Sequence, residues 1–341
     1  MSTNLSSHGT LPIADTLTGL RSIGSVWRRF AAYVMDGILL GVIGAGVGTA
    51  FFDKLSQLGL WGRLFGFCIA VAYFTFFDSR IGNGQTFGKR LLELRVIDVQ
   101  GNTISFAKSL LRTAIFVVPS FLYELRLPES RTPWIVSAAI FVVVLWVGGS
   151  TLYLIIFDRH SRQGLHDLAI GSYVANANDT GSVGTEQIAK VQWAILGVLL
   201  VIISATAGIV ISMFEERPPF PQMRQDAGLV EQMDGVQRAH VRDTLLHSSS
   251  SGGVKKDLIL SITLKSKSLN QEAFADAVAR TILQNDRNAQ NYDQLSILLI
   301  RGYDIGIAQR WNHQEFVHTP AEWRQRVLGA SPAQIPTSTH Q

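Results

Sequence analysis

One carboxylate stands out in this sequence because it interrupts a long apolar run. Asp36 follows Arg29 by seven positions in the stretch RRFAAYVMDGILLGVIGAGVG. A carboxylate near the centre of a membrane helix costs roughly 2.5 to 3.5 kcal/mol on insertion scales. A chain that keeps such a residue is therefore expected to have a partner or a task for it.

Asp36 and Arg29 cannot pair with each other inside one helix. Seven helical residues turn through about 700° and rise about 10.5 Å, so the two side chains share a face but stay too far apart for a salt bridge. Arg29 is expected at the membrane surface, where its guanidinium can snorkel or bind lipid phosphate. Asp36 lies deeper and needs a donor from another helix or from a polar segment folded inward. Arg112, Arg63 and Ser120 are the candidates.

Two interpretations of Asp36 remain open at this point. In the first, Asp36 is a proton or cation site of an ion-coupled carrier, because burial and a nearby cation shift its pKa in opposite directions. In the second, Asp36 is a buried anchor that fixes helix packing. We favour the anchor, because one intramembrane carboxylate is few for a transporter. The helix glycines at GxxxG spacing, Gly37 with Gly41 and Gly44 with Gly48, allow close helix contact in either case.

The composition places these residues in a membrane protein. Charged residues make up 16% of the 341 residues and hydrophobic ones 47%, an imbalance that a soluble two-domain protein rarely shows. The net charge of +4 comes from basic residues that cluster between apolar runs, which indicates membrane topology and not nucleic-acid binding. The single cysteine, Cys68, excludes an intrachain disulfide and a cysteine metal site. No cleavable signal peptide is evident, so the first span is expected to direct insertion.

Five apolar segments predict an α-helical multi-pass bundle. Four of them are long enough to cross about 30 Å of hydrocarbon, although Arg63 near the start of the second must snorkel. The remaining segment, at 104–123, is interrupted by Lys108, Arg112 and Pro119, so an interfacial or re-entrant helix stays open beside a full crossing. The other four segments are 27–51, 58–77, 134–157 and 191–213.

The basic residues predict the orientation of the bundle. The connection at 78–112 is rich in arginine and lysine and is therefore expected in the cytoplasm, with the N-terminus on the same side. Glu215 and Glu216 follow the last span and place the rest of the chain outside. The predicted location is the bacterial inner (cell) membrane, with a cytoplasmic N-terminus and a periplasmic C-terminal domain. If 104–123 does not cross, the C-terminal domain switches sides.

The two cytoplasmic connections carry the remaining polar motifs. In the first, LELRVID at 92–98 alternates and a turn precedes TISF at 103–106, so we predict a short hairpin. The segment GNGQTFGKR lacks the spacing of a phosphate-binding loop. In the second connection, His166 and Asp167 are too few for a zinc site. We interpret this basic segment as a contact with anionic lipid headgroups, tied together by hydrogen bonds of His166 and Asp167.

Taken in order, these motifs resemble the RDD family of bacterial membrane proteins over about residues 25–176. The family is named for one arginine and two aspartates, which correspond here to Arg29, Asp36 and Asp167. The sequence departs from the family pattern at Ser172 and Tyr173, where the family more often has a threonine before the final strand. The resemblance implies a membrane domain for which transport of small ligands or ions has been proposed. The other residues of the motifs are Gly84, Thr86, Gly88, Lys89, Arg112 and His166.

The region 215–341 is predicted to be a small α+β domain. We expect an extended stalk at EERPPFPQ, a helix at 225–247, a flexible break at HSSSSGG and a strand in DLILSITLKS. A helix capped by Asn270, two strands in LSILLIRGYDIGIAQRW and a closing helix after Thr319 follow. Helices cover one face of the sheet, with Trp311 and Trp323 in the core or at an interface. His240, His247, His313 and His318 are expected at the surface.

These observations predict a non-enzymatic protein with an anchor or scaffold role, coupled to an extracytoplasmic interaction domain. The alternative is an ion or small-solute transporter that uses Asp36 and Arg29; an intramembrane enzyme lacks a nucleophile and base pair. The expected partners are the bilayer, anionic headgroups on the cytoplasmic side and a protein bound by 215–341, with no nucleic acid, cofactor or metal. The expected divisions are a disordered tail at 1–24, the RDD-like domain at 25–176, a linker at 177–189, the fifth span at 190–214 and the outer domain with a flexible C-terminal tail at 215–341.

Overall fold

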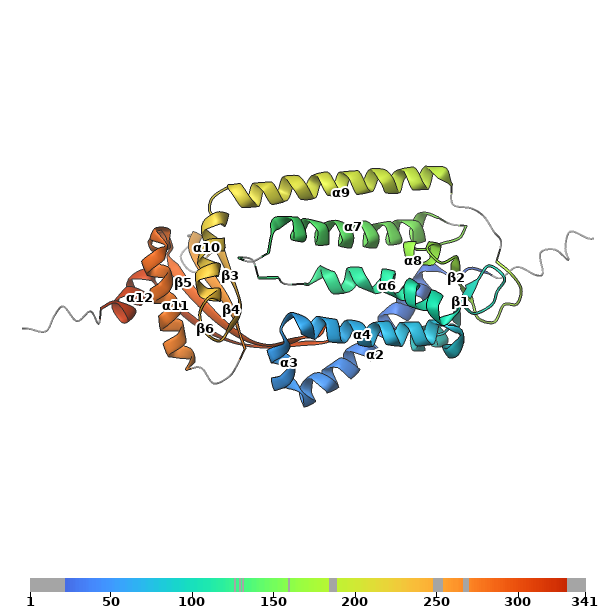
Figure 1. Ribbon diagram of the computed structural model, residues 1–341, viewed down its shortest axis with the longest axis horizontal. Helices are drawn as coiled ribbons and strands as arrows, with labels where there is room; N and C mark the ends of the chain where they lie inside the picture. The colour runs from blue at the N-terminus through green and yellow to red at the C-terminus, as the bar shows by residue number, and fades with distance from the viewer. Residues whose placement is uncertain are drawn as a thin grey trace, which may run out of the picture. The chain divides into compact units, whose positions relative to one another are not determined.

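The computed structural model describes residues 22–329 apart from 126, 129, 131, 159, 184–188, 248–253 and 266–269 (Figure 1). Most of the predicted N-terminal tail, nearly all of the predicted break HSSSSGG and the C-terminal tail lie outside the described residues. Among the first described residues, Ile23 forms a β-bridge with Ala175.

Five helices are long and apolar enough to cross a membrane, as the sequence predicted. The segment left open at 104–123 forms one of them, and Pro119 lies inside it without ending it. Large apolar side chains such as Trp27, Val42, Phe157 and Val201 are exposed on these helices, as expected for surfaces that face lipid. The helices are α2 (Val26–Ala50), α4 (Leu60–Asp78), α6 (Phe106–Tyr123), α7 (Trp134–Phe157) and α9 (Lys190–Glu216).

The chain divides into two compact units, each of which contains parts of membrane helices. Unit 1 consists of residues 1–41, 68–122 and 143–203, and unit 2 of residues 42–67, 123–142 and 204–341. The domain borders expected from the sequence remain a prediction.

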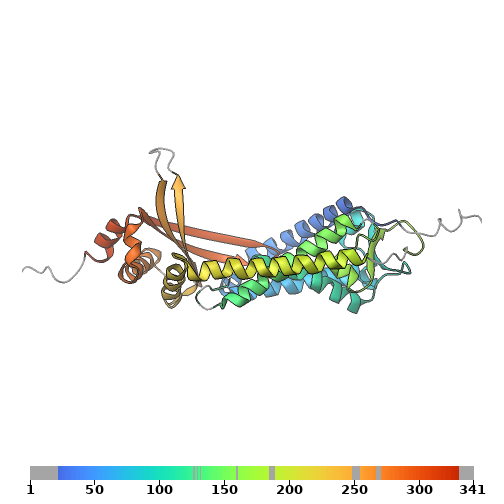
Figure 2. The ribbon, with the colours of Figure 1, turned by 90° about the horizontal axis from the view of Figure 1, so that it is seen from above.

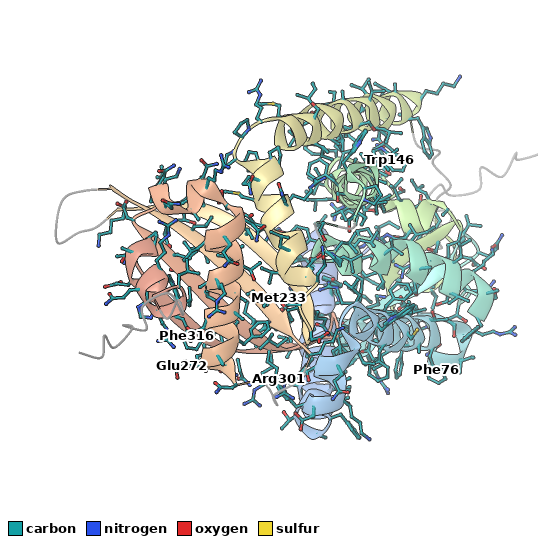
Figure 3. All side chains as sticks on the ribbon, turned by 60° about the vertical axis from the view of Figure 1, so that its left-hand side comes forward. Phe76, Trp146, Met233, Glu272, Arg301 and Phe316 are labelled. Carbon is teal, nitrogen blue, oxygen red and sulfur yellow. The ribbon has the colours of Figure 1, made fainter. Side chains whose placement is uncertain are left out.

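Unit 1 holds a two-stranded sheet beside its helices. Strand β1 (Leu94–Asp98) pairs antiparallel with β2 (Ser172–Asn176), with Val96 opposite Val174. The predicted hairpin of 92–98 with 103–106 is therefore wrong. The chain does turn after Asp98, but α6 begins at Phe106, and the almost fully buried β2 is the strand that pairs with β1. Trp146 of α7 (labelled in Figure 3) donates its indole N–H to the carbonyl of Leu196 in α9 at 3.0 Å.

The C-terminal part of unit 2 is built on a four-stranded sheet of order β3-β4-β5-β6. Strands β4 and β5 are parallel and joined through α11, while the outer pairs are antiparallel. The sheet and three helices share one hydrophobic core. The strands are β3 (Val236–His247), β4 (Val254–Leu264), β5 (Gln294–Asp304) and β6 (Gln309–His318), and the helices are α10 (Phe220–Glu231), α11 (Gln271–Asn285) and α12 (Pro320–Val327).

The sequence predicted most of this sheet region but misjudged its beginning. The strand in DLILSITLKS is β4, and Asn270 caps α11 through the backbone N–H groups of Glu272 and Ala273. Thr319 caps α12, and Trp323 is fully buried with its indole N–H on the carbonyl of Leu295.

Two expectations at the start of this region are wrong. There is no extended stalk, because α9 continues to Glu216 and α10 begins at Phe220. The predicted helix at 225–247 ends at Glu231, and after Gly235, which has a φ of 84°, the chain continues as β3. Pairing with β4 decides the conformation of β3 over its local sequence preference.

The β5–β6 hairpin also packs on the membrane-helix residues of unit 2. Figure 2 shows β5 and β6 as a long paired ribbon that extends beyond β3 and β4. Residues Tyr303–Ala308 at its tip lie against four glycines whose missing side chains make room for them: Gly44 and Gly48 of α2, and Gly62 and Gly66 of α4. The GxxxG pair at 44 and 48 therefore accommodates a hairpin and not another helix.

Polar contacts hold this hairpin as well. Arg63 of α4 is buried and pairs with Asp304 and with Glu124, the latter at 3.7 Å, so the prediction that Arg63 snorkels is wrong. Arg301 of β5 (labelled in Figure 3) pairs with Asp53 of α3 (Phe52–Leu58) and lies 5.1 Å from the ring centre of Phe52. The sheet and residues 42–67 are therefore one packed body.

Candidate functional site: a buried charge cluster in unit 1

Asp36 lies in α2 with only 1% of its surface exposed, and three donors surround its carboxylate. The hydroxyl of Tyr73 donates to Oδ1 at 2.8 Å, and the hydroxyl of Thr86 donates to Oδ2 at 2.5 Å. The backbone N–H of Gly88 donates to Oδ1 at 2.8 Å. All three donors are uncharged, and they come from α4 and from a polar segment folded inward.

The segment that carries Thr86 and Gly88 reaches Asp36 because of its local sequence. Thr86 caps the short helix α5 (Phe87–Leu91), and Gly84 has a φ of 68°, a left-handed conformation that favours glycine. A Cβ on Gly88 would collide with the backbone carbonyl of Ala32 in α2. Glycine at position 88 is therefore required for α5 to approach α2 closely enough to bind Asp36.

None of the three candidate partners of Asp36 is among these donors. Arg112 and Arg63 pair with other carboxylates, and no contact of Ser120 with Asp36 is seen in the described part of the chain. A donor from another helix or from a polar segment folded inward was expected for Asp36, and both are present. The hydroxyl donors are Tyr73 and Thr86. Sequence distance hid them, since the helix of Tyr73 and the loop of Thr86 meet Asp36 only in the folded chain.

A second cluster of charges surrounds Asp78, which is fully buried at the end of α4. The Asp78 carboxylate accepts hydrogen bonds from Lys89 of α5 at 2.7 Å and from Arg112 of α6 at 2.7 Å. Arg112 also donates to Asp167 of α8 (Leu165–Leu168) at 2.8 Å. Ser172 of β2 donates to the same Asp167 oxygen at 2.8 Å. Arg112 thus bridges two buried carboxylates from different elements.

Burial and neighbouring charges shift the pKa values of the cluster residues that lie outside the membrane spans. Burial alone would raise the pKa of Asp167, but Arg112 and His166 hold that pKa well below its usual range. Burial lowers the pKa of Lys89, while the nearby Asp78 opposes the change. Burial also lowers the pKa of His166, while the neighbouring Asp167 opposes the change. The Nδ1 atom of His166 is buried and has no hydrogen-bond partner among the described residues.

Arg29 serves as a donor to the backbone and not as a surface anchor. Its guanidinium donates to the carbonyl of Val174 in β2 at 2.6 Å and to the carbonyl of Arg162. It also interacts electrostatically with Asp167. The expectation that Arg29 snorkels toward lipid headgroups is therefore wrong, and its role is to tie α2 to β2.

The predicted site residues thus meet in one unit but in two arrangements. Thr86 and Gly88 bind Asp36, with Gly84 shaping their loop, while Lys89, Arg112, Asp167 and His166 gather around the ion pairs. Sequence reasoning missed Asp78, whose signal was a carboxylate directly after an apolar span and directly before a basic loop. Together the two arrangements contain the carboxylates Asp36, Asp78 and Asp167 and the cations Lys89 and Arg112, with Arg29 close to Asp167.

The chemistry of this cluster is binding and packing. Arg112 and Lys89 donate hydrogen bonds to the carboxylates of Asp78 and Asp167 and so join α4, α5, α6 and α8. Over the described residues, no group of three or more histidine, cysteine, aspartate or glutamate side chains is arranged to hold a metal ion.

Comparison with known proteins gives one match. The model of the RDD family matches residues 23–171, which include Asp36, Asp78, Asp167 and every donor to them described above except Ser172. No match was found among curated proteins or among solved structures. Together with the five apolar helices, this match shows that residues 23–171 form an RDD-family domain of a membrane protein.

Proposed function

We propose that this protein is a membrane anchor or scaffold of the bacterial inner membrane that holds an interaction domain on the outer side. The observation that carries the proposal is that protein donors bind three buried carboxylates of unit 1. Asp36 accepts three hydrogen bonds, Asp78 binds Lys89 and Arg112, and Asp167 binds Arg112 and Ser172. A carrier must release and rebind its ion, whereas carboxylates held by protein donors fix helices in place.

The packing of unit 2 supports the coupling of the anchor to the C-terminal sheet. Leu55 of α3 shares a small core with Tyr303 and Ile305 of the hairpin, and the Arg63–Asp304 pair lies beside it. A sheet attached only through a loop would lack such contacts. We infer that the sheet region acts together with the membrane helices when it binds a protein partner.

The proposed orientation places the N-terminus in the cytoplasm and the sheet region outside. Five spans and the basic residues at 78–112 support it, because positively charged loops stay on the cytoplasmic side. A reporter that is active only in the periplasm, fused after residue 341, is expected to be active. Activity of a cytoplasm-only reporter at the same position would overturn this orientation.

Transport is the second candidate, and one observation favours it. The donors to Asp36 are all uncharged, so the burial of its negative charge is not balanced by a cation in direct contact. A carboxylate in such a place can bind a proton or a small cation. This candidate predicts that Asp36 exchanges its ion during a transport cycle.

Flux measurements in proteoliposomes separate the two candidates. The natural protein, Asp36→Asn and the control Asp98→Asn, which changes the carboxylate at the end of β1, are reconstituted at equal density. The anchor proposal predicts that proton and sodium fluxes of all three equal those of empty liposomes. A gradient-driven flux that is present in the natural protein and in Asp98→Asn but lost in Asp36→Asn would overturn it and establish transport.

A further inference from the structure

The tip of the β5–β6 hairpin, residues Tyr303–Ala308, contacts α4 well beyond the first turn of that helix. Gly66 of α4 lies so close to Ile305 that a Cβ at position 66 would collide with the carbonyl oxygen of Ile305. Gly66 is the seventh residue of α4, which begins at Leu60. At about 1.5 Å per residue, Gly66 lies about 9 Å along the helix from Leu60. The hairpin tip therefore reaches the same level of α4.

The length of α4 places this level inside the bilayer. The helix has 19 residues, and a transmembrane helix needs about 20 to cross the hydrocarbon, so α4 has no turn to spare outside the membrane. Leu64 and Phe65, next to Gly66, are 48% and 44% exposed, as expected for side chains that contact acyl chains. On α2, Ile43 beside Gly44 is 45% exposed. The contacts of the hairpin tip with α2 and α4 therefore lie at the level of lipid.

An ion pair gives a second reason for the hairpin to reach this depth. Arg63 lies one turn before Gly66 and is buried, and a charged side chain within a span has a large energetic cost unless it is paired. Asp304 of the hairpin pairs with Arg63, and Glu124 lies 3.7 Å from the same guanidinium nitrogen. The hairpin thus brings a counter-charge to a cation that α4 carries into the bilayer.

The backbone of the tip suits a place without water. Non-helical backbone is tolerated at membrane depth only where protein surrounds it or satisfies its polar groups. The N–H of Ile305 donates to the carbonyl of Ala308 at 3.0 Å, and the N–H of Gly306 donates to the carboxylate of Asp304 at 2.8 Å. Ile305 is fully buried. The turn therefore satisfies two of its own N–H groups, as a segment within lipid must.

We propose that the tip of the β5–β6 hairpin is a re-entrant element that enters the hydrocarbon region of the bilayer beside α2 and α4. Ile307 packs on Gly44 of α2 and is partly exposed, and its exposed part contacts acyl chains. The sheet region is then attached to the membrane at a point other than α9, the span that precedes it in the chain. This inference holds for an anchor and for a carrier alike, and it does not depend on the orientation of the chain.

Electron paramagnetic resonance of nitroxide labels tests the proposal on the full chain in phosphatidylcholine liposomes. Labels are attached to Ile307→Cys at the tip and to Asp234→Cys in the turn after α10, each combined with Cys68→Ser. Cys68, the single cysteine of the natural protein, is exposed on α4 two residues after Gly66 and is labelled as the reference for lipid. The accessibility of each label to oxygen, which concentrates in hydrocarbon, is divided by its accessibility to a water-soluble nickel complex. This ratio cancels the effect of local crowding.

The expected ratio at the tip is that of a label in lipid. It should approach the value at Cys68 and exceed the value at Asp234→Cys severalfold, and a label at Ala308→Cys should give the same result. A ratio at Ile307→Cys and Ala308→Cys equal to that at Asp234→Cys would place the tip in water and overturn the proposal.

Two glycines supply a matched pair of variants. Gly66→Val puts a side chain where the carbonyl of Ile305 lies, whereas a Cβ on Gly46 of α2 would meet nothing within 4 Å. The ratio at Ile307→Cys is expected to fall toward the value for water in Gly66→Val, because the tip is displaced, and to stay unchanged in Gly46→Val. Circular dichroism of both variants checks that the sheet is intact. An unchanged ratio in Gly66→Val would contradict insertion of the tip beside α4.

Discussion

The two units of this protein use opposite chemistry in their interiors. In unit 1, charged side chains from four elements meet at Asp78 and Arg112. In the sheet region of unit 2, the interior is apolar, with Ile297, Ile262 and Trp323 fully buried. The difference follows from the solvent. Helices in lipid gain little by burying apolar groups, so polar contacts specify their packing, whereas a sheet in water is stabilised by apolar burial.

The largest loss of stability is expected when a charge is removed from the interior of unit 1. Arg112→Met leaves Asp78 with Lys89 alone and removes the arginine that is hydrogen-bonded to Asp167. Breaking a buried pair typically destabilises by about 3 to 5 kcal/mol, because an uncompensated charge stays buried. We expect this loss in the free energy of unfolding, measured by denaturant titration in mixed micelles.

The control for this change is an arginine on the surface of the sheet region. Arg326→Met removes ion pairs with Glu272 and Asp276 on α11, which are worth about 0 to 1 kcal/mol because they are exposed to water. Equal losses in the two variants would remove the contrast between the units.

The second effect tests the apolar interior of unit 2. Ile297→Ala deletes a fully buried side chain from β5 and is expected to destabilise by about 2 to 5 kcal/mol through lost burial and a cavity. Thermal unfolding followed by the sheet's circular dichroism measures it. Val317→Ala on β6 is the control, because Val317 is 40% exposed. A loss from Val317→Ala as large as that from Ile297→Ala would show that the sheet does not depend on this core.

The smallest effect is expected for Asp226, a buried carboxylate of α10. Burial raises the pKa of Asp226 to about 7, opposed by a hydrogen bond from Gln222 and reinforced by the nearby Asp286. Its Oδ2 has no partner among the described residues. Between its usual pKa of 3.8 and about 7, the folded state keeps a proton that the unfolded chain releases. Stability therefore falls as pH rises through this window and stays lower above it.

Asp226→Asn removes that dependence on pH. The variant is expected to melt at a higher temperature than the natural protein at pH 8, with a smaller difference at pH 5, as read by differential scanning fluorimetry. The exposed Asp234→Asn serves as control and is expected to show the same difference at both values. A difference for Asp226→Asn that does not grow with pH would contradict a protonated Asp226.

The positions of helices and strands were more predictable from the sequence than the pairing between them. The spans follow from long apolar runs, and β4, α11 and α12 follow from alternation and from the caps at Asn270 and Thr319. Strand β1 was predicted, yet its partner β2 lies more than seventy residues further on, with two membrane spans between them. Local patterns carry no information on such pairing, so the nearest turn suggested a false hairpin.

The site shows the same limit. Asp36 drew attention because a carboxylate in a span has a large energetic cost, and the family motif gave Thr86, Gly88 and Arg112. The pairing within this set could not be derived, because it depends on how α5 folds against α2 and on the contact that Gly88 permits. Arg29 and Arg63 were both expected to snorkel, since the sequence does not show the carbonyl and carboxylate groups that bind them.

A double-mutant cycle between Asp78 and Arg112 tests the central claim most directly, namely that buried charges hold unit 1 together. The free energies of unfolding of the natural protein, Asp78→Asn, Arg112→Met and the double variant are measured in mixed micelles. We predict that the double variant is less destabilised than the sum of the single variants by about 1 to 3 kcal/mol, as for residues in direct contact. Losses that add to within about 0.5 kcal/mol would contradict the claim.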